Sequence, residues 1–476
     1  MNNNLLEGIA EVFKKYLNGL EAKQKQKRLH FPLSQMNDIT HYLFTKIDTG
    51  GVCSIPVPAK PSWNPENQYF SDQREASKRG VQIERALLLP LKHLANDPIV
   101  QKQLELDINA GIKIRLLYIG NLLKECRLPF IDSLEYSVWD NKILASKFYS
   151  EENHTPLEYI ISSNDEDLEV ALNNWNLILT EAIELSPTNG NGNSLDLEEP
   201  MLTTAPVAEF LSKVLCKGNH INSENCQWYH SVWQYFRILD LVSTPTWHAD
   251  FYFDQIHNNI KEDKLTTILI SGTADYSMLA HVFWAIKDIP DDKIKIVVLD
   301  LCETPLFLCK WYASSINRSI ETISQDIFKF EPPELFDIIV TDAFLTRFSL
   351  ELRIRILEKW YSLLLPGGTV ITTVRIGGSS IGLARKGSQY QTEQFVKNIR
   401  ASGRQWRDFL PISLEELETH GKYYAENMVS HSAGSNKDIT NLFEKAKFNI
   451  LFSKENEVKG ELQPTTYLDI VAKKAY

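Results

Sequence analysis

The sequence predicts an α/β protein whose C-terminal half forms a doubly wound sheet of mostly parallel strands, preceded by a separate N-terminal α/β domain. From residue 265 to 375, short apolar runs alternate with helical patterns, and this alternation is typical of βαβ units. The apolar runs at 448–454 and 466–473 follow the last helical pattern with no helix between them, which indicates an antiparallel closing pair. Residues 186–200, rich in Gly, Asn, Ser and acids, separate the two halves as a linker.

The first unit of the predicted sheet spans residues 267–283. The apolar run 268–270 suits a strand that is buried on both faces, and it leads into Gly272. A helical pattern then opens at about Ser277. Because Gly272 has no Cβ, we expect a ligand to approach the backbone there. The first N–H groups of the following helix would point towards that ligand.

Acidic residues stand at the ends of two further predicted strands. The run 293–300 ends in Asp300, and a carboxylate at the tip of the second strand is placed to accept hydrogen bonds from ribose hydroxyls. The run 336–343 carries Asp342 at the end of the fourth strand. Sites in open α/β sheets form at this edge.

Two smaller features complete the pattern. An Asp-Ile pair at 326–327 follows a short third strand at 319–323. A helix at 353–365 stops at the Pro-Gly-Gly turn 366–368, which leads into a fifth strand at 369–374.

With these features in this order, residues 265–375 resemble the domain of class I S-adenosylmethionine-dependent methyltransferases. The resemblance implies a seven-stranded, Rossmann-like sheet that binds S-adenosylmethionine. It implies that the turn at 272–274 faces the methionine part of the cofactor, that Asp300 holds the ribose hydroxyls and that the pair 326–327 meets the adenine. The cofactor-binding residues implied in this way are Gly272, Thr273, Ala274, Asp300, Leu301, Asp326, Ile327 and Asp342.

The glycine turn departs from the family pattern. Where the family usually carries a second and a third glycine, this chain has Ala274 and Tyr276. Alanine still allows a fairly close approach, but nothing would let the backbone reach two phosphates. This departure disfavours a nicotinamide oxidoreductase, which is one alternative. An aminopropyltransferase that uses decarboxylated cofactor is a more remote variant of the same fold.

Direct SN2 methyl transfer needs a base only if the attacking group is protonated. The candidates are Asp342, by its family position near the transferred methyl group, and His248, which titrates near neutral pH. Each has a structural alternative, as a helix N-cap for Asp342 and as a hydrogen-bonded core residue for His248. Trp247, Tyr252 and Arg375 are candidate substrate-pocket residues, although the two aromatics could equally pack in the core and Arg375 could lie on the surface.

The same features bear on the substrate. After the fourth strand the chain reads Asp-Ala-Phe-Leu, at 342–345, where adenine N-methyltransferases of DNA carry an Asp/Asn-Pro-Pro-Tyr type motif. Together with a net charge of −11, this argues against a nucleic-acid partner and favours a small molecule or a peptide. The alternative function is a non-catalytic sensor, in which the fold binds S-adenosylmethionine and the N-terminal half reports it.

Composition bounds the remaining possibilities. No apolar run reaches the length of a membrane span, and the N-terminus lacks the pattern of a secretory signal. Six cysteines without paired spacing predict reduced thiols in a cytoplasmic protein. The closest two, Cys302 and Cys309, do not suggest a metal site, so no metal is expected. A homodimer remains open.

The predicted domains are an N-terminal helical segment (1–65), a small α/β binding or dimerisation domain (66–185), the linker (186–200), a helical lid (201–260) and the methyltransferase domain (261–476). The first segment includes an amphipathic helix at 4–28. In the second segment, helical patterns occupy 82–95, 98–109 and 166–184. Strand patterns occupy 111–118 and 156–162, and a hairpin is predicted from 133–139 and 142–148. This domain faintly resembles the phospholipase D-like domain of some bacterial regulators, without its His-x-Lys-x4-Asp motif.

Overall fold

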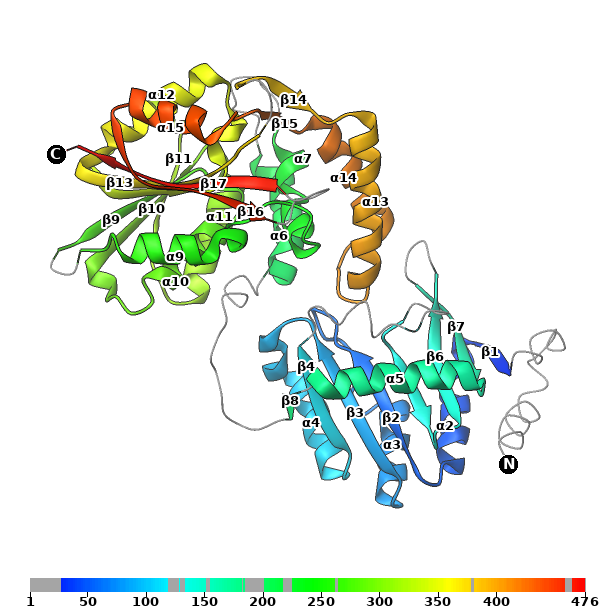
Figure 1. The fold of residues 1–476 in the computed structure, drawn as a ribbon. Helices are drawn as coiled ribbons and strands as arrows, with labels where there is room; N and C mark the ends of the chain where they lie inside the picture. The colour runs from blue at the N-terminus through cyan, green and yellow to red at the C-terminus, as the bar shows by residue number, and fades with distance from the viewer. Residues whose placement is uncertain are drawn as a thin grey trace. The chain divides into compact units, whose positions relative to one another are not determined.

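The computed structural model describes residues 27–118, 128, 133–150, 155–181, 183–184, 201–216, 225–261, 264–377, 381–458 and 465–475. The chain forms two compact units (Figure 1). One comprises Met1–Gly190 with Gly403–Glu415, and the other comprises Asn191–Ser402 with Glu416–Tyr476. The predicted helix at 4–28 and the predicted linker at 186–200 lie outside the described residues. Among the described residues no helix is both long and apolar enough to cross a membrane.

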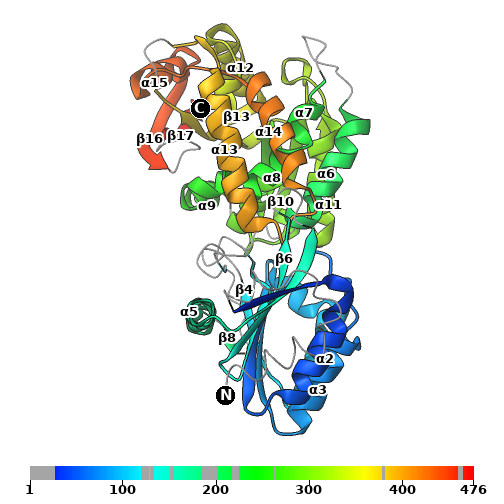
Figure 2. The same cartoon turned by 90° about the vertical axis from the view of Figure 1, so that its right-hand side faces the viewer.

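The first unit is an eight-stranded sheet with helices on both faces. Its strands are β1 (Arg28–Pro32), β2 (Gly50–Pro56), β3 (Gln82–Leu89), β4 (Lys113–Tyr118), β5 (Tyr136–Trp139), β6 (Ile143–Tyr149), β7 (Pro156–Ser162) and β8 (Ile183–Glu184), in the order β1-β7-β6-β5-β2-β3-β4-β8. Its helices are α2 (Met36–Lys46), α3 (Gln68–Lys78), α4 (Pro98–Asn109) and α5 (Asp165–Glu181). Helices α2 and α3 cover one face and α5 covers the other (Figure 2).

Two expectations for this unit are wrong. Residues 82–89, predicted to be helical, form the central strand β3, which pairs in parallel with β2 and β4. A short run of buried apolar residues fits either period, and here burial between two neighbouring strands decides for a strand. The predicted boundary at 65 also does not hold for the described residues 27–65, because β1 and β2 belong to the same sheet as β3.

The second unit contains a seven-stranded sheet in the order β11-β10-β9-β12-β13-β17-β16. Its strands are β9 (Thr266–Ser271), β10 (Ile294–Asp300), β11 (Glu321–Ser324), β12 (Phe336–Thr341), β13 (Leu364–Arg375), β16 (Phe448–Val458) and β17 (Thr465–Lys474). The first five are parallel, whereas β17 runs antiparallel to both β13 and β16. The doubly wound α/β architecture of this half is as predicted.

Helices cover both faces of this sheet and also precede it. They are α6 (Met201–Leu215), α7 (Gln227–His230), α8 (Trp233–Ile238), α9 (Ala249–His257), α10 (Ser277–Ala285), α11 (Glu303–Ser315), α12 (Leu350–Leu363), α13 (Gln389–Trp406), α14 (Leu414–Asn427) and α15 (Asn436–Lys445). Helices α9, α10 and α11 pack in one core cluster against one face, while α12 and α15 pack in another against the opposite face (Figure 1).

Two segments of this half form short elements. Residues 227–238 form two helices, α7 and α8, which are separated at Ser231 and Val232. After β13, the segment rich in glycine, serine and basic residues contains the short strand β14 (Ala384–Lys386), which pairs with β15 (Val429–His431).

A buried arginine ties α12 to this strand pair. Arg353 is fully buried and donates hydrogen bonds to the carbonyl oxygens of Leu345 at 2.8 Å, Ser432 at 2.8 Å and His431 at 2.6 Å. Burial lowers the pKa of Arg353 to about 10, so the side chain is still cationic at neutral pH. A charged donor therefore satisfies three backbone carbonyls at once.

We expect Arg353→Met to destabilise the protein by about 2–4 kcal/mol, because the variant leaves these buried carbonyls without donors. Urea unfolding followed by circular dichroism measures the change. Arg355→Met on the same helix is the matched control, since Arg355 is exposed and its guanidinium only stacks on Phe328 at 4.6 Å. Its loss should cost about 0.5–1 kcal/mol. Equal effects of the two substitutions would contradict the role assigned to Arg353.

Candidate active site

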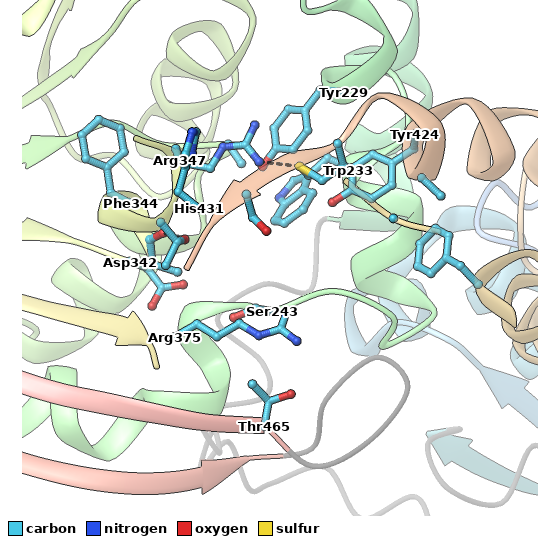
Figure 3. A pocket seen from close by; sticks show the side chains of 18 of the residues that line it. Tyr229, Trp233, Ser243, Asp342, Phe344, Arg347, Arg375, Tyr424, His431 and Thr465 are labelled. Carbon is cyan, nitrogen blue, oxygen red and sulfur yellow. Dashed lines mark hydrogen bonds between the residues drawn. The ribbon is translucent and has the colours of Figure 1, made fainter. Parts of the chain in front are cut away.

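A cavity of about 1620 Å³ lies in the second unit, at the carboxyl ends of the parallel strands. Gly272, Asp300 and Asp342 line it from the sheet edge, and Arg375 and Tyr424 are among its other lining residues. Figure 3 shows Asp342 and Phe344 on one side and Tyr229, Trp233 and Tyr424 on the other. Small-molecule sites usually measure about 300–1,000 Å³, so this volume has room for more than one ligand.

The glycine turn after β9 is held rigidly. Gly272 has a φ of +77°, and its N–H donates to the carbonyl of Leu299 at 2.8 Å. The buried carboxylate of Asp275 accepts hydrogen bonds from the N–H of Ser277 at 2.8 Å and from the guanidinium of Arg237 at 2.6 Å. The left-handed conformation of Gly272 and the buried ion pair of Asp275 with Arg237 together fix the path of the backbone into α10.

The space in front of Gly272 is taken by a side chain. A Cβ at Gly272 would clash with the ring of Phe344. The glycine is therefore required by its φ and by this ring, while Gly272 itself still lines the cavity. A ligand would meet the turn further along, at Thr273 and Ala274, which line the cavity as predicted.

Tyr276, at the place of the family's third glycine, does not obstruct the cavity. Its side chain is fully buried and stacks on Tyr312 of α11, with ring centroids 4.6 Å apart and an interplanar angle of 6°. The tyrosine therefore packs between α10 and α11, on the core side of the turn.

Asp300 lies where the sequence predicts, at the end of β10 and on the cavity. One carboxylate oxygen accepts the N–H of Thr273 at 3.0 Å, and the other accepts the N–H of Cys302 at 2.8 Å. Desolvation raises the pKa of Asp300, against the effect of these two hydrogen bonds. Each oxygen still has lone-pair capacity for a further donor, as a pair of ribose hydroxyls would supply.

The predicted adenine side is not part of the cavity lining. The carboxylate of Asp326 accepts the N–H of Phe328 at 2.9 Å and so caps the turn at 327–329. Ile327 is buried in the core, and Leu301 lies 41% exposed next to Asp300. These three residues share the edge of the sheet with Asp300, but none of them lines the cavity.

Asp342 is oriented by two hydroxyl groups at the end of β12. Its carboxylate accepts hydrogen bonds from Tyr252 at 2.8 Å and from Thr373 at 2.6 Å. Tyr252, predicted to line the substrate pocket, is instead fully buried beneath Asp342, and burial raises its pKa well above the usual value, so it stays a donor. The next residue, Ala343, has a φ of +47°, a strained conformation that also lies on the cavity.

The other candidates from the segment before β9 do not line the cavity. His248 is 2% exposed; its Nδ1 lies 2.9 Å from a carboxylate oxygen of Asp469 on β17, and its ring packs on Tyr467. The indole of Trp247 donates to Asp240 at 3.3 Å. His248 is therefore a buried residue beside Asp469 that does not border the cavity.

A wall of aromatic rings faces the two acids across the cavity. Tyr229 stacks on Trp233, with centroids 4.9 Å apart, and on Tyr424, with centroids 6.0 Å apart. The guanidinium of Arg347 lies 5.3 Å from the centroid of the Tyr229 ring. Arg375, predicted as a pocket residue, also lines the cavity and is exposed. The wall therefore offers flat apolar surface and positive charge together.

His431 is a candidate that sequence reasoning missed. It ends β15, lines the cavity and lies next to Arg347 (Figure 3). Its Nδ1 is buried and has no hydrogen-bond partner among the described residues. Burial, then Arg353 and Arg347, lower the pKa of His431 from 6.5, so its ring is neutral at neutral pH. No motif surrounds this histidine in the sequence, and only its contacts reveal it.

Comparison with known proteins gives limited matches. No family model matches the chain, and no curated protein matches it. Among solved structures, TehB from Haemophilus influenzae is 12% identical, with 46% of this chain and 62% of that chain covered and a TM-score of 0.31. The N-methyltransferase NodS from Bradyrhizobium japonicum, in complex with S-adenosyl-l-homocysteine, is 14% identical, with 51% and 98% covered and a TM-score of 0.29.

A third match is the 1,6-didemethyltoxoflavin-N1-methyltransferase of Burkholderia thailandensis, at 12% identity and a TM-score of 0.35, with 62% of this chain and 96% of that chain covered. Similarity this low carries no weight for function, which has to be inferred from the strand order and the cavity of the chain itself. The likeness of the N-terminal half to phospholipase D-like domains has no support among these structures.

We expect Gly272→Ala to destabilise the protein by about 1–2 kcal/mol through its left-handed φ alone, and by more through the clash with Phe344. Denaturant unfolding of Gly272→Ala, Phe344→Ala and the double variant measures both parts. In the Phe344→Ala background the cost of Gly272→Ala should fall, because the ring is gone. Gly80→Ala is the control, since Gly80 has a φ of +101° and no atom near the place of a Cβ. If the effects of Gly272→Ala and Phe344→Ala on the free energy of unfolding are strictly additive, the clash between a Cβ at residue 272 and the ring of Phe344 is excluded.

Proposed function

We propose that the second unit is a class I S-adenosylmethionine-dependent methyltransferase that acts on a small molecule. The observation that supports this best is the position of Asp300 and Asp342 on one cavity, at the ends of the strands that flank β9. The order of the parallel strands reverses at β9, and open α/β sheets bind their ligands at such a switch point. The residues at this point suit a nucleoside with an attached amino acid.

Three features of the cavity lining suit the cofactor. Asp300 is held by two backbone N–H groups, with its oxygens still able to accept ribose hydroxyls. The turn at Thr273 and Ala274 borders the same cavity, as does Asp342. S-adenosylmethionine, when bound, supplies an electrophilic methyl group. The chain is left to align the acceptor, exclude water and receive a proton.

The walls of the cavity favour an aromatic, anionic acceptor. Tyr229, Trp233 and Tyr424 provide faces for stacking a planar ring. Arg347 and Arg375 line the same cavity and can pair with a carboxylate or phenolate. In a chain of net charge −11, basic residues gathered at one cavity suit an anionic small molecule better than a nucleic acid.

His431 is the group we assign as base for an acceptor that carries a proton. Its lowered pKa keeps the ring neutral, and the residue lines the cavity. Asp342 is already engaged by Tyr252 and Thr373, which suits it better to positioning than to proton transfer.

We expect Asp300→Ala to weaken the binding of S-adenosylhomocysteine by about 1–3 kcal/mol, roughly 5- to 150-fold, because charged hydrogen bonds to the ribose are lost. Isothermal titration calorimetry measures the affinity. Asp326→Ala is the matched control, since Asp326 does not line the cavity and its loss should change affinity far less. Unchanged affinity in Asp300→Ala would remove the basis of the proposed cofactor site.

Turnover separates an enzyme from a sensor. Incubation with S-adenosylmethionine labelled in its methyl group and a panel of aromatic acids should give labelled product if the chain is a methyltransferase. Tight binding with no transfer to any member of a broad panel would favour the alternative, a non-catalytic sensor of S-adenosylmethionine. The calorimetry therefore tests the proposed cofactor site, whereas the turnover experiment tests whether a methyl group is transferred.

We expect the acid limb of the pH profile of kcat to lie below pH 6.5, since the pKa of His431 is lowered and the neutral, proton-accepting ring persists into acid. Arg347→Gln removes one of the charges that lower this pKa, so the limb should move to higher pH. His431→Gln should abolish the limb and reduce kcat by about 10²–10⁴-fold. A limb that stays in place in His431→Gln would assign the base to another residue.

A further inference from the structure

A cluster of three cysteines and one histidine lies beside the proposed cofactor site in the second unit. Cys216 directly follows α6, Cys226 directly precedes α7 and His230 ends α7. Cys302 is the residue before α11, two positions after Asp300 at the end of β10. The potential ligand atoms of these four residues all lie within 4.8 Å of one another.

The distances in this cluster match those around a single tetrahedral ion. The sulfur of Cys302 lies 3.5 Å from that of Cys216 and 3.6 Å from that of Cys226, and Nδ1 of His230 lies 3.4 Å from the sulfur of Cys216. Bonds of about 2.3 Å to sulfur and 2.0–2.1 Å to nitrogen would give edges of about 3.8 Å and 3.6 Å in a regular tetrahedron. An ion would therefore fit after a small outward shift of the ligands.

Contacts among thiols alone give no comparable reason for this arrangement. A thiol is a weak donor and a weak acceptor, so three neighbouring thiols gain little from one another. The sulfurs are also much further apart than the roughly 2.05 Å of a disulfide, and these three cysteines form no disulfide. Cys309 shows the ordinary alternative, because it is fully buried in the apolar core with its sulfur 3.6 Å from a backbone carbonyl.

Burial and chemistry indicate which ion is suited. Cys216, Cys302 and His230 are 4%, 5% and 8% exposed, and Cys226 is half-buried. Four protein ligands with little access for water are typical of a closed structural site, and three thiolates with one imidazole are a ligand set that selects zinc. From this geometry we propose that Cys216, Cys226, His230 and Cys302 bind one zinc ion with a structural role.

The surroundings of the cluster can stabilise its negative charge. Three thiolates and a neutral imidazole around Zn²⁺ carry one net negative charge. The hydroxyl of Thr304, which is fully buried, lies 3.3 Å from the sulfur of Cys216 and can donate to it. Cys302 stands at the N-terminal end of α11, a helix of 13 residues, where backbone N–H groups favour a thiolate.

The site would join parts of the chain that are remote in sequence. It fastens the ends of α6 and α7 to the loop after β10, across 71 residues between His230 and Cys302. The N–H of Cys302 also donates to the carboxylate of Asp300. Zinc would therefore hold in place both α7, which borders the cavity, and the acid proposed to bind the ribose. The proposal itself does not depend on methyltransferase activity.

The proposed zinc site departs from the sequence-based expectation of no metal. That expectation considered Cys302 with Cys309, which lie on the same segment, whereas the structure places Cys302 with Cys216 and Cys226. The spacing from Cys216 to Cys226 is too long for a familiar zinc motif. Cys226 and His230, separated by three residues, were the signal in the sequence that could have suggested a site.

The experiment measures zinc in the full-length chain, purified without chelator from zinc-supplemented medium. We expect near one zinc ion per chain by mass spectrometry of the elements. Cys226→Ala, at the half-buried position where folding is least affected, should lose the zinc, whereas Cys226→His should retain it as a conservative ligand exchange. Cys309→Ser is the matched control, since it alters a cysteine outside the cluster and should keep the zinc.

A second measurement keeps the test independent of any variant. After removal of zinc with a chelator under reducing conditions, added Co²⁺ should give the visible absorption of a tetrahedral site with thiolate ligands, and Cys226→Ala should give none. Wild-type protein that carries no zinc and does not bind Co²⁺ would overturn the proposal. So would a disulfide between two of these cysteines in freshly isolated protein, found by alkylation and mass measurement, or a Cys226→Ala variant that keeps its zinc.

Discussion

The reversal of strand order at β9 is the constraint on which the rest of the C-terminal unit depends. Strand β10 lies on one side of β9 and β12 on the other, so the chain crosses over in opposite directions from this one strand. The loops that follow the three strands then diverge and leave a crevice. Gly272, Asp300 and Asp342 all face that crevice because each lies directly at the end of one of these strands.

Around this crevice, buried charges fix backbone positions that hydrophobic packing alone would leave undetermined. Arg237 pairs with Asp275 and so anchors the glycine turn to α8. Arg353 donates to three carbonyl groups and so positions the strand that carries His431. Both arginines are buried, and directional hydrogen bonds from a charged donor select one geometry where apolar contacts accept several.

The zinc ion proposed for the cluster of cysteines and a histidine would also fix backbone positions, by metal coordination instead of hydrogen bonds. Helices α6 and α7 precede the sheet in sequence, and only α11 with its preceding loop brings Cys302 to them. A metal ion would close this contact with four bonds of fixed length. The proposed zinc site and the proposed cofactor site meet at Asp300, whose carboxylate receives the N–H of Cys302.

The sequence by itself determined the repeating units of the C-terminal half and the places of its acids. Strands buried on both faces, glycine turns and acids at strand ends are local patterns, and local patterns can be read along the chain. It also placed Thr273, Ala274 and Arg375 on the cavity. Residues 82–89 were misjudged because a short, continuous apolar run has no period that distinguishes a strand from a helix.

Only the tertiary structure decided which side chains share the cavity. His248 and Tyr252 had chemically suitable side chains, but the packing of α9 and β17 buries them away from it. His431, Arg347 and Tyr424 carry no motif, and the cluster of three cysteines and one histidine joins Cys216 to Cys302, 86 positions later in the chain. Contacts between residues so far apart depend on how whole elements pack, and no local pattern in the chain records that packing.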